Sequence, residues 1–340
     1  ADRTVETDSF AVFGEATYSV TDKLSIVLGG RYTDEEISAN YDRQSAAIDG
    51  ALPFGPFLGP DLVGVQEVSE ENFSGRGIIR YFWTENLMTY FTYSRGYKGP
   101  GIDVAESANA DAIAMVGGLP VLDAEIPTLY ELGLKTRLFD DTLEVNAVVY
   151  TQDVDDLQTI TTDSLGTITN LSIDRVNSTG IEIDTTYTPP IIEGLTLTGT
   201  YTLNEVDIEK FEERTDLEDQ RLRDSPRHFY SLVGDYRRPN VFKDMEGFAR
   251  AEWTWQSEKN SSLTPADFSQ IDSYGLLNLR AGLNSADGGY GVSFAVENVT
   301  DEDYAHFILG TSYGTLDDNQ TSAQYIGEPR TYSVTLRGSF

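Results

Sequence analysis

The chain has 340 residues, no cysteine and a formal net charge of -32 at pH 7. This acidity excludes nucleic acid as a partner, because phosphate binding depends on lysine and arginine. The mean hydropathy is -0.32, and no segment approaches the roughly 20 apolar residues that a transmembrane helix needs. These values do not exclude a membrane barrel, because its alternating strands give only a weak hydropathy signal.

Alternating apolar and polar side chains predict a chain made almost entirely of β-strands, about 13 in number. The first strand covers about residues 9–20, and the turn at 21–23 leads directly into the second strand, residues 24–33. The later strands are expected, in order, near residues 74–83, 87–96, 130–137, 143–161, 181–187, 195–203, 230–236, 249–256, 277–284, 290–297 and 331–340. Long loops are predicted at about residues 38–68, 97–126 and 205–224.

The connections between these strands alternate in length. Short turns follow the odd-numbered strands, and mostly longer loops follow the even-numbered ones. One edge with tight turns and another with long loops is typical of outer-membrane barrels. A soluble β-sheet protein, such as a propeller or a lectin, remains the alternative on alternation alone.

The two faces of the predicted strands differ in a way that favours a membrane barrel. One face carries whole charges, and the other carries aliphatic residues with Tyr or Trp near the strand ends, as an interfacial girdle does. Charged residues expected to point away from lipid include Arg31, Arg76, Arg80, Glu131, Lys135, Glu182, Arg250, Glu252, Arg280 and Arg337. Residues expected to face lipid include Leu279, Val292, Phe294, Val334 and Leu336. The last strand ends at Phe340, where an aromatic side chain would lie at the lipid–water boundary.

Four stretches resemble the TonB-dependent outer-membrane receptor family. They are FTYSRGYKGPG at 91–101, PTLYELGLKTRLF at 127–139, DRVNSTGIEIDTTY at 174–187, and VENVTDEDY at 296–304 together with the closing GEPRTYSVTLRGSF. Within the family, the chain is similar to siderophore receptors of the pesticin/yersiniabactin-receptor type. The resemblance implies an antiparallel transmembrane β-barrel of about 22 strands around a plug domain. Residues 1–340 are then expected to be the C-terminal part of that barrel, with the first strands and the plug outside this sequence.

The resemblance also implies a function and partners. The function is active uptake of a scarce nutrient, most simply a ferric siderophore, across the outer membrane of a Gram-negative bacterium. The implied partners are the TonB–ExbB–ExbD complex, acting through the plug, and lipopolysaccharide with the other outer-membrane lipids. The alternatives are a passive porin or structural barrel, and a TonB-dependent receptor for a carbohydrate or a vitamin.

Candidate binding residues fall into two groups. Tyr97 and Lys98 follow a strand end punctuated by glycine and proline, where Tyr97 could stack on a ligand or could simply mark a bend at the interface. Tyr304 and Phe307 lie in an aromatic stretch near the C-terminus. The expected plug-facing side chains in the lumen are Glu131, Glu182, Arg250 and Arg280, the two glutamates by resemblance to family members whose matching residues pair with plug arginines.

The sequence offers no enzyme, metal site or cofactor site. Its two histidines, His228 and His306, have no flanking nucleophile motif, so we expect no catalytic residues. The acidic loop residues lack the spacing of a calcium-binding EF-hand. Eight acidic residues gather between Glu205 and Asp219, which would repel an anionic ligand and favours a neutral or cationic cargo. Alternatively, these acids bind divalent cations beside lipopolysaccharide.

Overall fold

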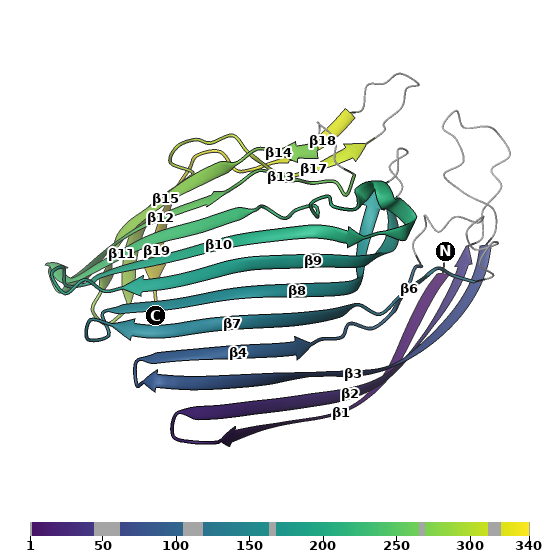
Figure 1. Ribbon diagram of the computed structural model, residues 1–340. Coiled ribbons are helices and arrows are strands. Elements are labelled where there is room, and N and C mark those ends of the chain that lie inside the picture. Colours follow the sequence, from purple (N-terminus) through teal and green to yellow (C-terminus); the bar gives the residue numbers. More distant parts are fainter. Residues whose placement is uncertain are drawn as a thin grey trace.

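The computed structural model describes residues 2–43, 62–104, 118–162, 168–264, 269–311 and 321–339. Within these ranges, 13 strands form one sheet in the order β1-β2-β3-β4-β7-β8-β9-β10-β11-β12-β15-β16-β19. Every neighbouring pair in that sheet is antiparallel, and Figure 1 shows the sheet as a curved wall. The predicted antiparallel wall is therefore confirmed, whereas the predicted place of Phe340 lies outside the described residues.

The wall strands are long, and the remaining elements are short. The wall consists of β1 (Asp2–Ser19), β2 (Leu24–Arg43), β3 (Leu62–Thr84), β4 (Leu87–Arg95), β7 (Ile126–Leu138), β8 (Leu143–Thr162), β9 (Ile168–Tyr187), β10 (Leu195–Lys210), β11 (His228–Phe242), β12 (Met245–Gln256), β15 (Tyr274–Ser285), β16 (Tyr290–Glu297) and β19 (Thr331–Gly338). Three small hairpins lie in the connections: β5 (Gly101–Ile102) with β6 (Val121–Leu122), β13 (Lys259–Asn260) with β14 (Gln270–Ile271), and β17 (Ala305–Thr311) with β18 (Thr321–Ile326). A 3₁₀ segment, η1, covers Glu212–Leu217, and within the described ranges no helix is long and apolar enough to span a membrane.

Two predicted loops are partly strand. Residues 38–43 and 62–68 extend β2 and β3, which stay paired in register from Ser38 opposite Glu67 to Arg43 opposite Leu62. Residues 205–210 likewise extend β10, which remains paired with β9. The loop predictions were too long because residues 38–43 and 205–210 are rich in polar residues, and part of their apolar packing comes from distant segments, Leu119 and Leu263.

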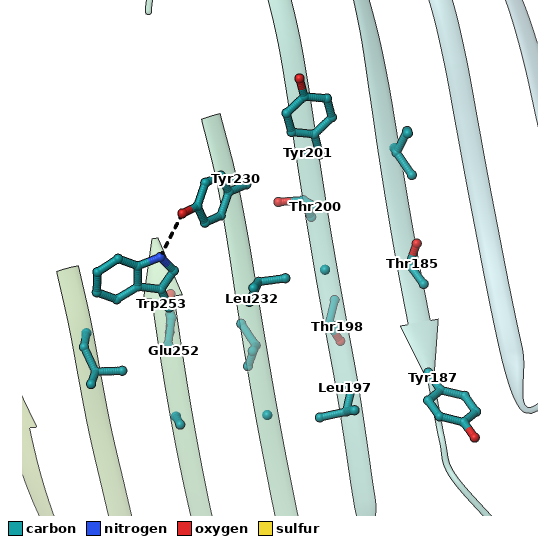
Figure 2. Close-up of a pocket in the computed structure, with 16 residues that line it drawn as sticks. Thr185, Tyr187, Leu197, Thr198, Thr200, Tyr201, Tyr230, Leu232, Glu252 and Trp253 are labelled. Carbon is teal, nitrogen blue, oxygen red and sulfur yellow. Dashed lines mark hydrogen bonds between the residues drawn. The ribbon is translucent and has the colours of Figure 1, made fainter. Parts of the chain in front are cut away.

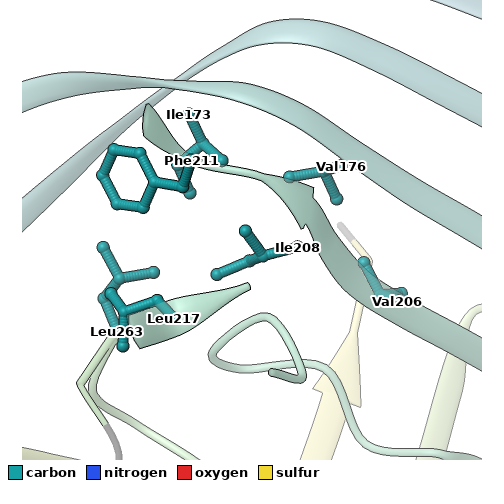
Figure 3. Close-up of a cluster of buried hydrophobic side chains, with 7 residues drawn as sticks. All are labelled: Ile173, Val176, Val206, Ile208, Phe211, Leu217 and Leu263. Atoms are coloured by element: carbon teal, nitrogen blue, oxygen red, sulfur yellow. The ribbon is translucent and has the colours of Figure 1, made fainter. Parts of the chain in front are cut away.

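The extended parts of the strands and the loops that pack on them form two buried apolar clusters at the long-loop end. In the first, Ala39 and Tyr41 of β2 pack with Leu119 from the β4–β7 connection. The second, shown in Figure 3, joins β9 and β10 to η1 and to the β12–β15 connection through Ile173, Val176, Val206, Ile208, Phe211, Leu217 and Leu263. By alternation, Ala39 and Tyr41 share the face of Arg31 on β2, and Val206 and Ile208 share the face of Thr202, which lies opposite Glu182 of β9. The long loops therefore fold back over the polar, inner face of the wall.

The outer face carries the apolar residues, as predicted. Phe294 lies opposite Val334 and Val292 lies opposite Leu336, and these side chains are between 40% and 78% exposed. Arg280 belongs to the other face, where it lies opposite Arg250 and Ala295. Large exposed apolar side chains on a continuous sheet face indicate contact with an apolar medium.

Candidate functional site

The candidate site is the inner face of the wall at the long-loop end. The base of the β4–β7 connection is attached there by Tyr97, whose hydroxyl donates a hydrogen bond to Glu35 Oε2 of β2 at 3.1 Å. Burial, followed by this bond and the charge of Glu35, raises the pKa of the Tyr97 phenol. Tyr97 is thus a neutral, partly buried contact between loop and wall.

Lys98 has a partner on the other side of the same loop. Its backbone forms an isolated antiparallel bridge with Glu125, and its Nζ lies 3.1 Å from Glu125 Oε2. More than half of the Lys98 side chain is exposed, but only 17% of the Glu125 side chain is. The two ends of the loop are therefore clamped together, and the ammonium group is already neutralised.

Gln158 of β8 fixes this clamp to the wall. Its side-chain Nε2 donates to the carbonyl oxygens of Gly99, at 2.9 Å, and of Asp123, at 2.8 Å. Its backbone N–H also donates to Glu125 Oε2 at 3.2 Å. One strand residue thus holds both ends of a long loop, and nothing in the local sequence around Gln158 pointed to this role.

The second predicted group forms an aromatic cluster beside β15. The Tyr304 ring packs against Tyr274, with 4.5 Å between ring centroids, and edge-on against His306 at 4.9 Å. It also covers Gly327, where a Cβ would lie 2.0 Å from the ring. Phe307 instead packs against Tyr325 across the β17–β18 hairpin, with centroids 6.1 Å apart.

The two predicted groups are not brought together. Tyr97 and Lys98 attach to β2 and β8, whereas Tyr304 lies against Tyr274 of β15. The strands β9, β10, β11 and β12 lie between β8 and β15 in the sheet. Any single ligand touching both groups would have to bridge the inside of the wall.

Farther down the inner face, glycines make room for tyrosine rings. Tyr150 of β8 lies directly opposite Gly180 of β9, and a Cβ on Gly180 would be 2.6 Å from the Tyr150 hydroxyl oxygen. That hydroxyl donates to Asn204 Oδ1 at 3.1 Å, which also accepts from Ser178 at 2.9 Å. Gly180 belongs to the Gly-x-Glu motif that resembles the receptor family. Its lack of a side chain leaves space for the Tyr150 ring, which explains why this position of the motif is a glycine.

The four lumen residues predicted to face a plug differ in their partners. Arg250 is held within the wall by Asp235 at 3.4 Å and by Glu252 at 3.2 Å. Arg280 lies opposite Arg250 and borders a hollow of about 180 Å³ with Glu252, Asn278 and Glu297. Among the described residues, Glu131, Glu182 and Arg280 form no ion pair.

A charged hollow of about 590 Å³ at the long-loop end was missed by the sequence analysis. Its lining residues come from five strands, β4, β7, β8, β9 and β10: Arg95, Ile126, Thr128, Asp155, Asp156, Asp174, Arg175 and Lys210. Arg175 is bonded to Asp155, its register partner, at 2.8 Å, and Lys210 to Glu212 at 2.5 Å. Only the sheet register brings these residues together, and their charges largely balance.

Neither histidine belongs to a catalytic arrangement among the described residues. His228 Nδ1 lies 3.0 Å from the Tyr201 hydroxyl, and the His228 backbone N–H donates to Ser257 Oγ at 3.1 Å. His306 packs against Tyr304. Within the same ranges no group of three or more His, Asp or Glu side chains is arranged to hold a metal ion.

Comparisons with known proteins agree with this architecture. The family model for the TonB dependent receptor-like β-barrel matches residues 1–299. The pesticin receptors of Yersinia enterocolitica serotype O:8 / biotype 1B (strain NCTC 13174 / 8081) and of Yersinia pestis are each 24% identical to the chain over 177 residues. That alignment covers 52% of this chain but 23% of each receptor.

Solved structures show the same fold. The ferric yersiniabactin uptake receptor FyuA from Yersinia pestis superposes with a TM-score of 0.76 and 17% identity, covering 99% of this chain and 46% of that one. The closed form of the ferric-catecholate import receptor Fiu from E. coli K12 superposes with a TM-score of 0.69 and 18% identity, covering 98% of this chain and 44% of that one. The chain thus spans less than half the length of these receptors. It belongs to the TonB-dependent receptor family, as part of an outer-membrane β-barrel.

Proposed function

We propose that the protein carrying this chain is a receptor for the active uptake of a ferric siderophore. The observation that carries this proposal is the anchoring of the β4–β7 connection and of η1 on the inner face of the wall. A passive porin needs an open lumen, whereas a receptor needs a built binding chamber at its extracellular end. The siderophore receptors among its relatives support the same cargo class.

The cargo that fits this chamber best is neutral or cationic. Just below their extension, β2 and β3 carry Glu35 and Glu70 on the inner face, beside Tyr97. Two basic side chains near it are paired with carboxylates: Lys98 with Glu125 and Arg175 with Asp155. A ferric complex with a mixed ligand set and little net negative charge would not be repelled by this acidic lining. Tyr97 on one side of the lumen, or Tyr304 and Phe307 on another, would supply aromatic surface for it.

Coupling to TonB would require parts of the protein outside this chain. In the proposed arrangement a plug fills the lumen and contacts Glu131, Glu182 and Arg280, which have no ionic partner among the described residues. A buried charge without a partner is costly, so a plug arginine opposite the glutamates and a plug carboxylate opposite Arg280 would stabilise the assembled receptor. Lipopolysaccharide and the other outer-membrane lipids would surround the wall.

Uptake of iron-labelled siderophores by cells separates these proposals. Cells that express the full-length protein should accumulate a neutral or cationic ferric siderophore only when TonB is present. Uptake that persists without TonB would indicate a passive channel instead. Tight binding of a multiply anionic ferric siderophore that weakens as salt rises would show that a basic site recognises the cargo, which contradicts the proposed cargo class.

A further inference from the structure

A groove on the outer face of the wall is unexplained by cargo uptake. It is a cavity of about 700 Å³ across β9, β10, β11 and β12, shown in Figure 2. Its floor is formed by small residues, Gly199, Gly234 and Ala251, and the groove is bordered by larger ones, Tyr187, Leu197, Tyr201, Tyr230, Leu232, Trp253 and Leu277.

The register explains why the sheet is hollow here. Gly234 lies opposite both Leu197 and Ala251, and Gly199 lies opposite Thr185 and Leu232, so small side chains adjoin along a diagonal. Tyr201 and Tyr230 lie opposite each other and raise one border. A Cβ on Gly234 would still be 3.6 Å from the nearest atom, Leu197 Cδ2. The hollow therefore has room for additional carbon atoms.

The Trp253 indole, the Tyr201 hydroxyl and the Glu252 carboxylate around the groove are already paired. The Trp253 indole N–H donates to the Tyr230 hydroxyl at 3.3 Å, the dashed contact in Figure 2. The Tyr201 hydroxyl is 3.0 Å from His228 Nδ1. Glu252 also borders the groove, but its carboxylate is bonded to Arg250 at 3.2 Å. Apart from the hydroxyls of Thr185 and Tyr187, the surface offered to a ligand is mainly hydrocarbon and aromatic carbon.

The position of the groove along the strands indicates which membrane leaflet surrounds it. Tyr187 is the last residue of β9, and Leu197 is the third residue of β10, so the groove begins beside a tight turn. It rises from there over about five residues per strand, or roughly 13 Å. Tight turns of outer-membrane barrels are periplasmic. The groove is thus continuous with the lipid-facing belt in the periplasmic leaflet, where phospholipids reside.

We propose that this groove holds one acyl chain of a phospholipid from the periplasmic leaflet. A chain lying along the strand direction replaces the side chains that Gly199, Gly234 and Ala251 lack, and it contacts the Tyr230 and Trp253 rings. A close fit removes packing voids at the wall, because atoms beside an empty space lose their dispersion contacts. The headgroup then lies at the level of Tyr187, near the membrane surface.

The test is lipid retention by the full-length receptor. Native mass spectrometry would follow the purified protein in detergent as phosphatidylethanolamine is titrated in. Gly234→Leu and Ala251→Leu each fill the groove, so the tightest phosphatidylethanolamine should bind about tenfold more weakly. Ala281→Leu is the matched control, because Ala281 lies on the same face outside the groove, and it should retain the lipid as the wild type does.

Three outcomes would overturn the proposal. Equal phosphatidylethanolamine retention by the wild type and both groove-filling variants would show that the groove is not a lipid site. Selective retention of lipopolysaccharide would assign the groove to the other leaflet. A change in oligomeric state on filling the groove, measured by sedimentation, would identify the occupant as a second copy of the protein. Two variants are used because one of them could misfold. The added leucine side chain enters the groove from β11 in Gly234→Leu and from β12 in Ala251→Leu.

Discussion

The Tyr90 ring of β4 lies directly over Gly133 of β7, so closely that a Cβ on Gly133 would be 2.2 Å from a ring carbon. The Tyr90 hydroxyl lies against Glu131 of β7, which is two residues from Gly133 and on the same face of that strand. Together with Tyr150 over Gly180, this makes two places where a glycine on the inner face receives a tyrosine ring from the preceding strand. Both glycines belong to the motifs that resemble the receptor family.

Gly133→Ala should therefore destabilise the wall by about 1–3 kcal/mol, the usual cost of forcing extra atoms into a packed site. The Tyr90 ring would have to leave its place and release Glu131. Denaturant unfolding of the full-length protein, followed by heat-modifiable gel mobility, measures the change. Gly77→Ala is the matched control, because a Cβ added to Gly77 of β3 would be 3.6 Å from its nearest neighbour, Leu28 Cδ2, which is an ordinary contact distance. Equal stability of the two variants would contradict the packing role of Gly133.

Gln158→Leu should release the base of the β4–β7 connection. The variant loses both hydrogen bonds from Nε2 to the carbonyls of Gly99 and Asp123, at a cost of about 1–3 kcal/mol to the local fold. Limited proteolysis should cut between these two residues faster than in the wild type, while the unfolding midpoint of the wall changes little. Gln152→Leu is the control on the same strand; faster cleavage in that variant as well would refute the specific role of Gln158.

Arg221→Met should cost more stability than Arg227→Met, although both arginines contact Glu205. Arg221 donates to Glu205 at 2.8 Å and also to the carbonyls of Asn204 and Ser225. Its side chain is 30% exposed, against 57% for Arg227. We expect Arg221→Met to lower the free energy of unfolding by about 2 kcal/mol, because it removes charge-assisted hydrogen bonds. Arg227→Met should lower it by under about 1 kcal/mol, because exposed ion pairs contribute little. Hydrogen exchange of residues 218–227 reports the change, and equal protection in both variants would refute it.

Most of the fold could be predicted from the sequence because its rule is local. Alternation along β15 alone places Leu279 and Arg280 on opposite faces without knowledge of any other strand. The predictions failed where that rule gave no signal. Residues 38–43 read as loop because Ala39 and Tyr41 are buried by Leu119, which lies about eighty residues farther along the chain.

The candidate site was less accessible to sequence reasoning. Tyr97 was identified through its glycine- and proline-rich surroundings, but its partner Glu35 could be found only from the packing of the loop on β2. Gln158 carries no motif, and its importance comes from two backbone carbonyls of another segment. The charged hollow around Arg175 depends on the register of several strands. Contacts between residues far apart in the chain produce no periodic pattern in the sequence, so alternation could not predict them.

The stability of the β2–β3 pair around Glu36 should rise as the pH falls. Glu36 lies within a group of carboxylates, and its pKa is raised above 4.5, chiefly by the charge of Glu67 and a hydrogen bond with it, and further by Asp8 and Asp34. A carboxyl group whose pKa is raised on folding stabilises the folded state below its unfolded pKa, and this contribution is lost as the pH rises through the folded pKa. At neutral pH the ionised Glu36 therefore opposes folding.

Glu36→Gln should accordingly raise the unfolding midpoint of the full-length protein at pH 7, because it removes the repelled charge. The gain over the wild type should shrink as the pH is lowered toward 4.5, the ordinary pKa of a glutamate, because the wild-type carboxyl then becomes protonated as well. Glu67→Gln provides the control, since it removes the main cause of the shift. In that background the further change Glu36→Gln should have a much smaller effect, so a double-mutant cycle isolates the repulsion between the two side chains. Independent, additive gains at neutral pH would show that these carboxylates do not interact.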